Sequence, residues 1–354
     1  MSNTSLTTMS QVTFKIDALR TRMQAAHKTA LLGGTREKAG DLDRSTNSML
    51  KLAAELRERG YAWEKDLEGK CIDARENWAA VRPQAMSAIE RETEALRART
   101  SDADWRFNNA IVQATNLDTA AQALAEAEQA VAGLESAAKA ADDAIDGMFE
   151  KLQTDVGALE RRMKSTLEQL DLAAKSKIGW LAGESLVRAV KAKWDRDGKD
   201  DPNGHLFLSD RRLAFERNEE VATKKTLFIV TEKKLIQDVM LDEPFDRLLD
   251  LEPSKRGLLR NEDHLDARYG PGARFSSAHF HIDGQDCKEW QLTLRRMKAG
   301  ELEASRAVPV SEAEKARLAN APSKCPVCAA PFEAPILRGQ SSIKCAYCGT
   351  ATAI

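Results

Sequence analysis

The chain has 354 residues and a formal net charge of −2, with 31% charged but only 5% aromatic side chains. Its length and its hydrophobic content of 42% allow two or three domains with cores of their own. The near-neutral charge argues against a nucleic-acid binder that depends on a large positive field. No run approaches the roughly 20 apolar residues of a membrane span, and the start, MSNTSLTTMS, lacks the order of a secretory signal. We therefore expect a multidomain, cytoplasmic protein.

The first half of the chain has the pattern of amphipathic helices. Residues 1–10 are rich in Ser, Thr and Asn, and we expect them to be disordered. From residue 11 to residue 194, apolar side chains recur at intervals of three and four, which predicts a helical region. Within it we expect one apolar stripe to run through Trp63, a kink or break at Pro83, and an apolar helix over 178–194 that docks on the following domain.

A seven-residue repeat marks the clearest part of this region as a coiled-coil seam. The two apolar series are Leu124, Val131, Ala138, Ile145, Leu152 and Leu159, and Ala127, Leu134, Ala141 and Met148. After Asp155 the second series continues one position later, at Val156, so a continuous ideal supercoil is not expected. The seam needs a cover: either the helices fold back as an antiparallel bundle, or two chains pair as a homo-oligomer. A structural arm is favoured over a membrane-remodelling surface, because no cationic, bulky-aromatic helical face accompanies the seam.

The character of the sequence changes after the Asp-, Gly- and Pro-rich linker 195–203. In 204–217, alternating apolar residues flank the turn signal Ser209-Asp210, which predicts a β-hairpin. Further strands are expected at 226–230, 235–240, 247–251, 264–269 and 277–282. A helix capped by Asp286 should follow, with Trp290 on its buried face.

Residues 204–299 resemble GRAM and other pleckstrin-homology-like (PH-like) domains. The resemblance rests on Gly-x-Leu-x-Leu-Ser-Asp-Arg-Arg-Leu-x-Phe at 204–215, on Glu262-Asp-x-Leu265, on Phe280-His-Ile-Asp-Gly284 and on the helix carrying Trp290. It implies a strongly bent β-barrel plugged by a C-terminal helix. It also implies a non-catalytic domain that offers its barrel mouth or a sheet edge to a lipid or a protein.

Basic doublets near the predicted turns of this domain are candidate contacts for an anionic ligand: Arg211, Arg212, Lys224, Lys225, Lys233 and Lys234. The competing interpretation is solvated turn charges, with the stem of Arg212 lying along the sheet. The range 204–299 holds as many acidic as basic side chains, which favours that interpretation. His279 and His281 share one strand face, but no carboxylate or Cys stands at a matching spacing, so we expect ordinary sheet positions.

The C-terminal segment carries the most specific motif. Residues 300–322 form a linker with a short helix beginning near Ser311. In 323–354, Cys325-Pro-Val-Cys328 and Cys345-Ala-Tyr-Cys348 are separated by sixteen residues, the spacing of a zinc ribbon with one structural Zn²⁺ held by all four cysteines. We expect Gly349 to adopt a left-handed backbone and 332–337 to pair with 342–344. Cys71 and Cys287 are expected to be buried in cores.

No Walker loop, dinucleotide fingerprint, nucleophile elbow or acid–base constellation is apparent, so we expect no enzyme activity. The favoured hypothesis is a cytoplasmic adaptor or scaffold. Its helical arm would oligomerise or act as a spacer, and its PH-like and zinc-ribbon modules would dock on a partner protein or, peripherally, on an anionic membrane. The alternative is a nucleic-acid-associated factor that contacts DNA or RNA through the ribbon. A third hypothesis is a membrane-remodelling coiled-coil protein.

Overall fold

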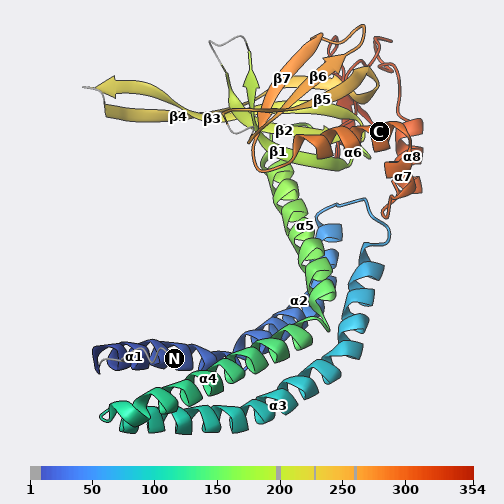
Figure 1. Cartoon of the computed structure of the whole chain (residues 1–354). Helices are drawn as coiled ribbons and strands as arrows, with labels where there is room; N and C mark the ends of the chain where they lie inside the picture. The colour runs from blue at the N-terminus through green and yellow to red at the C-terminus, as the bar shows by residue number, and fades with distance from the viewer. Residues whose placement is uncertain (1–8, 197–200, 227–228, 259–260) are drawn as a thin grey trace. The chain divides into compact units, whose positions relative to one another are not determined.

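The computed structural model describes residues 9–196, 201–226, 229–258 and 261–354, and the side chains of 222–233 lie outside the description. The chain divides into two compact units. The first comprises Met1–Lys51 and Gly69–Arg161, and the second comprises Leu52–Glu68 and Arg162–Ile354. Together they contain the three predicted parts: a helical bundle, a seven-stranded antiparallel PH-like sheet with a following helix, and a small four-Cys module (Figure 1).

Five helices contribute to the first unit, although α2 after Lys51 and α5 after Arg161 belong to the second unit. They are α1 (Met9–Ala30), α2 (Gly33–Glu58), α3 (Leu67–Gln113), α4 (Leu117–Asp146) and α5 (Glu150–Lys175). Arg22 of α1 pairs with Glu135 of α4, and Lys38 of α2 pairs with Asp146 farther along α4, so α4 runs parallel to α1 and α2. Among the described helices, none combines the length and apolarity that a transmembrane helix requires.

Helix α3 runs in the opposite direction beside them. His27 of α1 lies 3.1 Å from Asp104, near the end of α3, whereas Asp43 of α2 accepts a hydrogen bond from the indole of Trp78, near its beginning. The first unit is therefore a bundle of three rods, with α3 antiparallel to the other two.

The part of the heptad seam that lies on α4 is buried inside this bundle, whereas Met148 beyond it is 43% exposed. Leu124, Val131, Ala138 and Ile145 are all at most 2% exposed, and the companion positions of α4 are buried too. The predicted shift of the repeat, at residues 155–156, comes shortly after the junction of α4 and α5 at residues 147–149. Val156, where the repeat resumes, is buried. Of the two arrangements proposed to bury the seam, the structure thus has the intramolecular one, in which helices of the same chain pack on it.

The structure differs from the helical prediction in three places. The stripe through Trp63 is interrupted, because α2 ends at Glu58 and Gly60 adopts φ +90°, where the amide of Tyr61 bonds back to the carbonyl of Leu56. Helix α3 does not break at Pro83, and the alternative of a kink there stays a prediction. Residues 176–194 are not helical.

Instead, Leu186–Asp195 form strand β1, which pairs with β2 and β7. Val190, Ala192 and Trp194 alternate into the core with period two, and this alternation outweighs the helical spacing of Leu186, Val190 and Trp194 that suggested a helix. The sheet therefore begins before the predicted linker 195–203.

The other strands follow the PH-like plan. They are β2 (Asn203–Ser209), β3 (Arg212–Thr226), β4 (Ile229–Pro244), β5 (Leu248–Arg256), β6 (Glu262–Tyr269) and β7 (Ser277–Ile282), in the order β4-β3-β2-β1-β7-β6-β5. Helix α6 (Cys287–Lys298), capped by Asp286, buries Trp290 against the inner face of the sheet. The rings of Trp194, Phe215 and Phe280 form an aromatic cluster in the same core, with centroids 5.5–5.7 Å apart.

Gly204 explains why the first hairpin starts with glycine. It pairs with Arg217 of β3, and a Cβ atom at this position would lie 1.9 Å from the carbonyl oxygen of Glu216. Only glycine therefore lets β2 approach β3 so closely.

A buried ion pair fixes the turn of that hairpin. The side chain of Arg212 is 9% exposed and that of Glu184 is fully buried, with Arg212 Nε 3.0 Å from Glu184 Oε1. Arg212 also donates to Asp242 of β4, and the hydroxyl of Ser209 donates to the same Glu184 carboxylate. The turn is thereby joined both to β4 and to the segment that precedes β1.

We predict that Arg212→Met destabilises the folded chain by about 3 kcal/mol, because the carboxylate of Glu184 would remain buried without its cation. The matched control is Arg211→Met, since Arg211 is exposed beside it. That control should change stability by less than about 0.5 kcal/mol. Urea unfolding of the full chain, followed by tryptophan fluorescence, compares the two; equal effects would contradict the assignment.

Candidate metal centre

Two similar turns of the C-terminal module present the four cysteines. In the first, the amide of Ala329 donates to the carbonyl of Cys325 at 2.9 Å; in the second, Gly349 donates to Cys345 at 3.0 Å. Ala329 and Gly349 occupy equivalent left-handed positions, with φ of 58° and 76°. The left-handed backbone expected at Gly349 is thus confirmed, and the first turn imposes it on an alanine.

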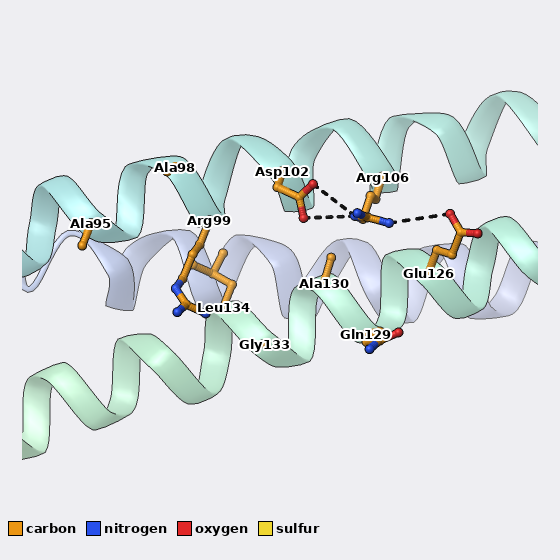
Figure 2. Close-up of a pocket in the computed structure, with 10 residues that line it drawn as sticks. All are labelled: Ala95, Ala98, Arg99, Asp102, Arg106, Glu126, Gln129, Ala130, Gly133 and Leu134. Atoms are coloured by element: carbon orange, nitrogen blue, oxygen red, sulfur yellow. Dashed lines mark hydrogen bonds and ion pairs between the residues drawn. The ribbon is translucent and has the colours of Figure 1, made fainter.

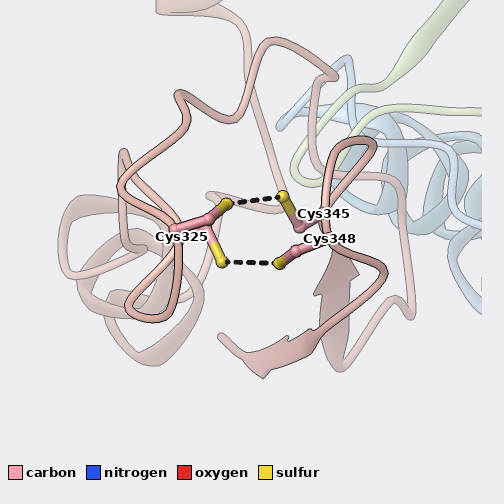
Figure 3. Close-up of side chains that lie close together, drawn as sticks. Cys325, Cys345 and Cys348 are labelled. Carbon is pink, nitrogen blue, oxygen red and sulfur yellow. Dashed lines mark hydrogen bonds between the residues drawn. The ribbon is translucent and has the colours of Figure 1, made fainter.

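The four sulfur atoms converge on one point. Cys325 Sγ lies 3.5 Å from Cys348 Sγ, and Cys328 Sγ lies 3.5 Å from Cys345 Sγ (Figure 3). All four lie within 4.8 Å of one another. These separations are too long for a disulfide, and four thiolates bonded at about 2.3 Å to a tetrahedral ion lie about 3.8 Å apart. The cluster can therefore hold one metal ion.

Two of the four thiols have a lowered pKa. Hydrogen bonds from Thr350 lower the pKa of Cys348 to about 6, and backbone N–H groups, that of Cys348 first, lower the pKa of Cys345. Because the thiolate is the form that binds metal, Cys348 is a ready ligand at neutral pH.

The module is anchored to the segment before β1. Leu337 forms a β-bridge with Leu181, and the guanidinium of Arg338 donates to the carbonyl of Glu184 and lies over the ring of Trp180. The predicted pairing of 332–337 with 342–344 is wrong: β8 (Ser342–Lys344) pairs with β9 (Ala351–Ala353), because Leu337 is already paired with Leu181.

Of the six candidate anion contacts, Arg212 is committed to its buried ion pair, so the prediction fails for this residue. Arg211 and Lys234 are exposed. The side chains of Lys224, Lys225 and Lys233 lie outside the described residues. The backbone of Lys233 and Lys234 lies in β4, not in the predicted turn, because β3 and β4 continue as a long hairpin as far as residues 226 and 229.

A groove of about 710 Å³ lies between α3 and α4, where Ala98, Ala130 and Gly133 are too small to fill the space between the helices (Figure 2). Three of its four charged side chains pair with one another: Arg106 pairs with Asp102 at 3.0 Å and with Glu126 at 3.7 Å. We therefore regard it as a gap in packing and not as a site.

Short helices connect α6 to the four-Cys module. They are α7 (Glu301–Ala304) and α8 (Glu312–Ala319), and the hydroxyl of Ser311 caps α8 as predicted. Arg306 lies between them, pairs with Asp210 at 2.6 Å and stacks at 4.2 Å on the ring of Trp63. Trp63 in turn donates to the carbonyl of Leu186. Sequence reasoning missed this contact because its members are far apart along the chain.

Comparison with known proteins gives no family: no family model and no curated protein matches this sequence. Among solved structures it is similar to the Vps36 N-terminal PH domain, with 14% identity, 34% of this chain and 83% of that chain covered, and a TM-score of 0.23. It is also similar to the DH/PH domains of p115-RhoGEF, with 13% identity, 83% and 95% coverage, and a TM-score of 0.23. A complex of PDZ-RhoGEF DH/PH domains with GTP-gamma-S activated RhoA matches at 12% identity, 83% and 96% coverage, and a TM-score of 0.21. We draw no functional argument from likenesses at this level.

The two equivalent left-handed positions generate a test. Gly349→Ala should cost about 1 kcal/mol, because alanine is strained in the left-handed backbone at this position. No clash adds to this cost, since a Cβ atom there meets no neighbouring atom. Ala329→Gly should relieve a strain of similar size. About 1 kcal/mol corresponds to about fivefold in affinity. Chelator competition should therefore rank metal affinity as Ala329→Gly above wild type and wild type above Gly349→Ala; the reverse order would contradict the equivalence of the two turns.

Proposed function

We propose that this chain is a non-catalytic adaptor that docks on a partner protein through its four-Cys module. The observation that carries the proposal is the exposure of Val327 and Tyr347, 69% and 72% respectively. Each occupies the third position of a Cys-x-x-Cys turn, so the two apolar tips are held on either side of the same sulfur cluster. Rigidly held, exposed apolar and aromatic side chains are typical anchors of protein interfaces.

The ion proposed for this cluster is structural zinc. Four thiolates complete a tetrahedral shell and leave no position for a reacting water. A module of about 30 residues cannot build a core large enough to hold itself together, and the metal supplies the missing stabilisation. Zinc would thus fix the two tips in place.

The hairpin of β3 and β4 offers a second docking surface. Strand β2 pairs with β3 only up to Arg217, and beyond it the two strands continue as a two-stranded ribbon. Such a ribbon is marginal in water alone, and its open edges can accept another strand. Leu235 is 56% exposed and Val239 37% exposed on β4, which favours a protein over an anionic membrane as the partner.

The nucleic-acid alternative receives less support. Of the three basic side chains in the four-Cys module, Arg338 is already bound to the carbonyl of Glu184 and to Trp180. Lys324 and Lys344 remain exposed. Two lysines provide little of the phosphate neutralisation on which nucleic-acid affinity depends.

We predict that the double variant Val327→Ser, Tyr347→Ser keeps one zinc per chain but loses its partner, because the substitutions remove the apolar anchors and leave all four ligands. Crosslinking followed by affinity purification of the full chain measures recovery of the partner, and metal analysis measures zinc. We expect recovery to fall at least about tenfold, the effect of losing about 1.4 kcal/mol.

The matched control is Leu292→Ser, which removes an apolar side chain of α6 that is 50% exposed. This control should leave recovery unchanged. Equal recovery with the double variant would contradict docking through the tips. Sedimentation with anionic vesicles, or salt-sensitive retention of DNA or RNA that is lost with Cys345→Ser, would favour the membrane or nucleic-acid alternative.

A further inference from the structure

Three of the five histidines of the chain meet on the outward face of β6 and β7. His264 stands directly opposite His281, and Asp266 stands opposite His279. The ring of His264 stacks on both other histidine rings, with centroids 5.1 Å from His279 and 4.8 Å from His281. This arrangement lies apart in sequence from the four-Cys module and belongs to the PH-like sheet.

A chain of hydrogen bonds fixes the tautomer of His264. His279 Nδ1 lies 2.5 Å from Asp266 Oδ1, so this nitrogen carries the proton that the carboxylate accepts. In a neutral ring, His279 Nε2 is then an acceptor, and it lies 3.0 Å from His264 Nδ1. His264 Nδ1 must donate to it. The remaining nitrogen, His264 Nε2, therefore presents a lone pair.

That lone pair has nothing to accept. The side chain of His264 is only 11% exposed, and its Nε2 atom is buried without a hydrogen-bond partner among the described residues. Glu262 Oε2, which is also an acceptor, lies 3.6 Å from this nitrogen. A cation bound between the two acceptors would satisfy both.

We propose that Glu262, His264 and His281 bind one divalent transition-metal ion of the zinc type. The three ligand atoms lie within 4.8 Å of one another, close enough to converge on a single ion. Two imidazoles and one carboxylate suit zinc and its neighbours, whereas magnesium and calcium take oxygen ligands. Three protein ligands leave a coordination position open toward solvent.

The neighbouring residues have the roles that a metal site requires. A metal-binding histidine commonly donates its second nitrogen to a group that holds its orientation, and His279 with Asp266 supply that group for His264. Arg256 lies 3.8 Å from Asp266 and so pairs with the same carboxylate that holds His279. His279 and Asp266 are thus positioning residues, while Glu262, His264 and His281 are the ligands.

The test is a zinc titration of the full chain by calorimetry at neutral pH. The metal content of the starting protein is measured first, to verify that the four-Cys site is already filled. We expect one further equivalent of Zn²⁺ to bind to the wild-type chain. His264→Ala and His281→Ala should each abolish this binding. Asp266→Asn should weaken it by about tenfold or more, since second-shell partners contribute about 10- to 100-fold to metal affinity. Added zinc should also raise the melting temperature of the wild type and leave that of His264→Ala unchanged.

His27→Ala and His205→Ala are the matched controls, because they remove the two histidines outside the cluster. Both should retain the additional equivalent. Circular dichroism without added metal verifies that each variant is folded, and His281 is 34% exposed, so its replacement leaves the core intact. The inference is overturned if the wild type binds no further equivalent, or if folded His264→Ala and His281→Ala both bind it as the wild type does.

Discussion

The arrangement of the second unit depends on the buried ion pair of Arg212 and Glu184. Burying two charges away from water is costly unless their hydrogen-bonding groups are satisfied. Here Ser209, Asp242 and the amide of Leu181 complete the hydrogen-bond network of the pair. The same short segment that contributes Glu184 also carries the bridge to the four-Cys module. One pair of charges therefore connects the first hairpin of the PH-like sheet, strand β4 and the four-Cys module.

The proposed docking surfaces, on the four-Cys module and on the hairpin of β3 and β4, are both connected to this ion pair. The four-Cys module of about 30 residues has little core, so its two exposed tips keep a fixed direction only if the module itself is fixed. The bridge between Leu181 and Leu337 and the bond from Arg338 to Glu184 fulfil that condition. In the proposed function, the buried charges would contribute to recognition without contacting the partner, by orienting the apolar side chains that contact it.

The sequence predicted features that depend on local spacing. Paired cysteines, the heptad seam of α4 and the cap at Asp286 each follow from intervals within a few turns of chain, and they are present as expected. Strand β1 was mistaken for a helix because its apolar residues satisfy both periodicities, and only pairing with β2 and β7 decides between them. Arg212 could not be separated from Arg211 because adjacent side chains of a strand face opposite sides, and the sequence alone does not specify which side is covered.

The histidine cluster shows the same limit for a site. His279 and His281 are two apart on one strand, and the absence of a carboxylate at a matching spacing spoke against a metal. The missing carboxylate lies on the neighbouring strand, where Glu262 and His264 repeat the same spacing of two. When two strands each carry such a pair, the register between them decides whether the ligands meet, and in this sheet His264 is opposite His281. A motif split across paired strands is therefore recognisable only once the register is known, whereas the two cysteine pairs reveal themselves because each forms its own turn.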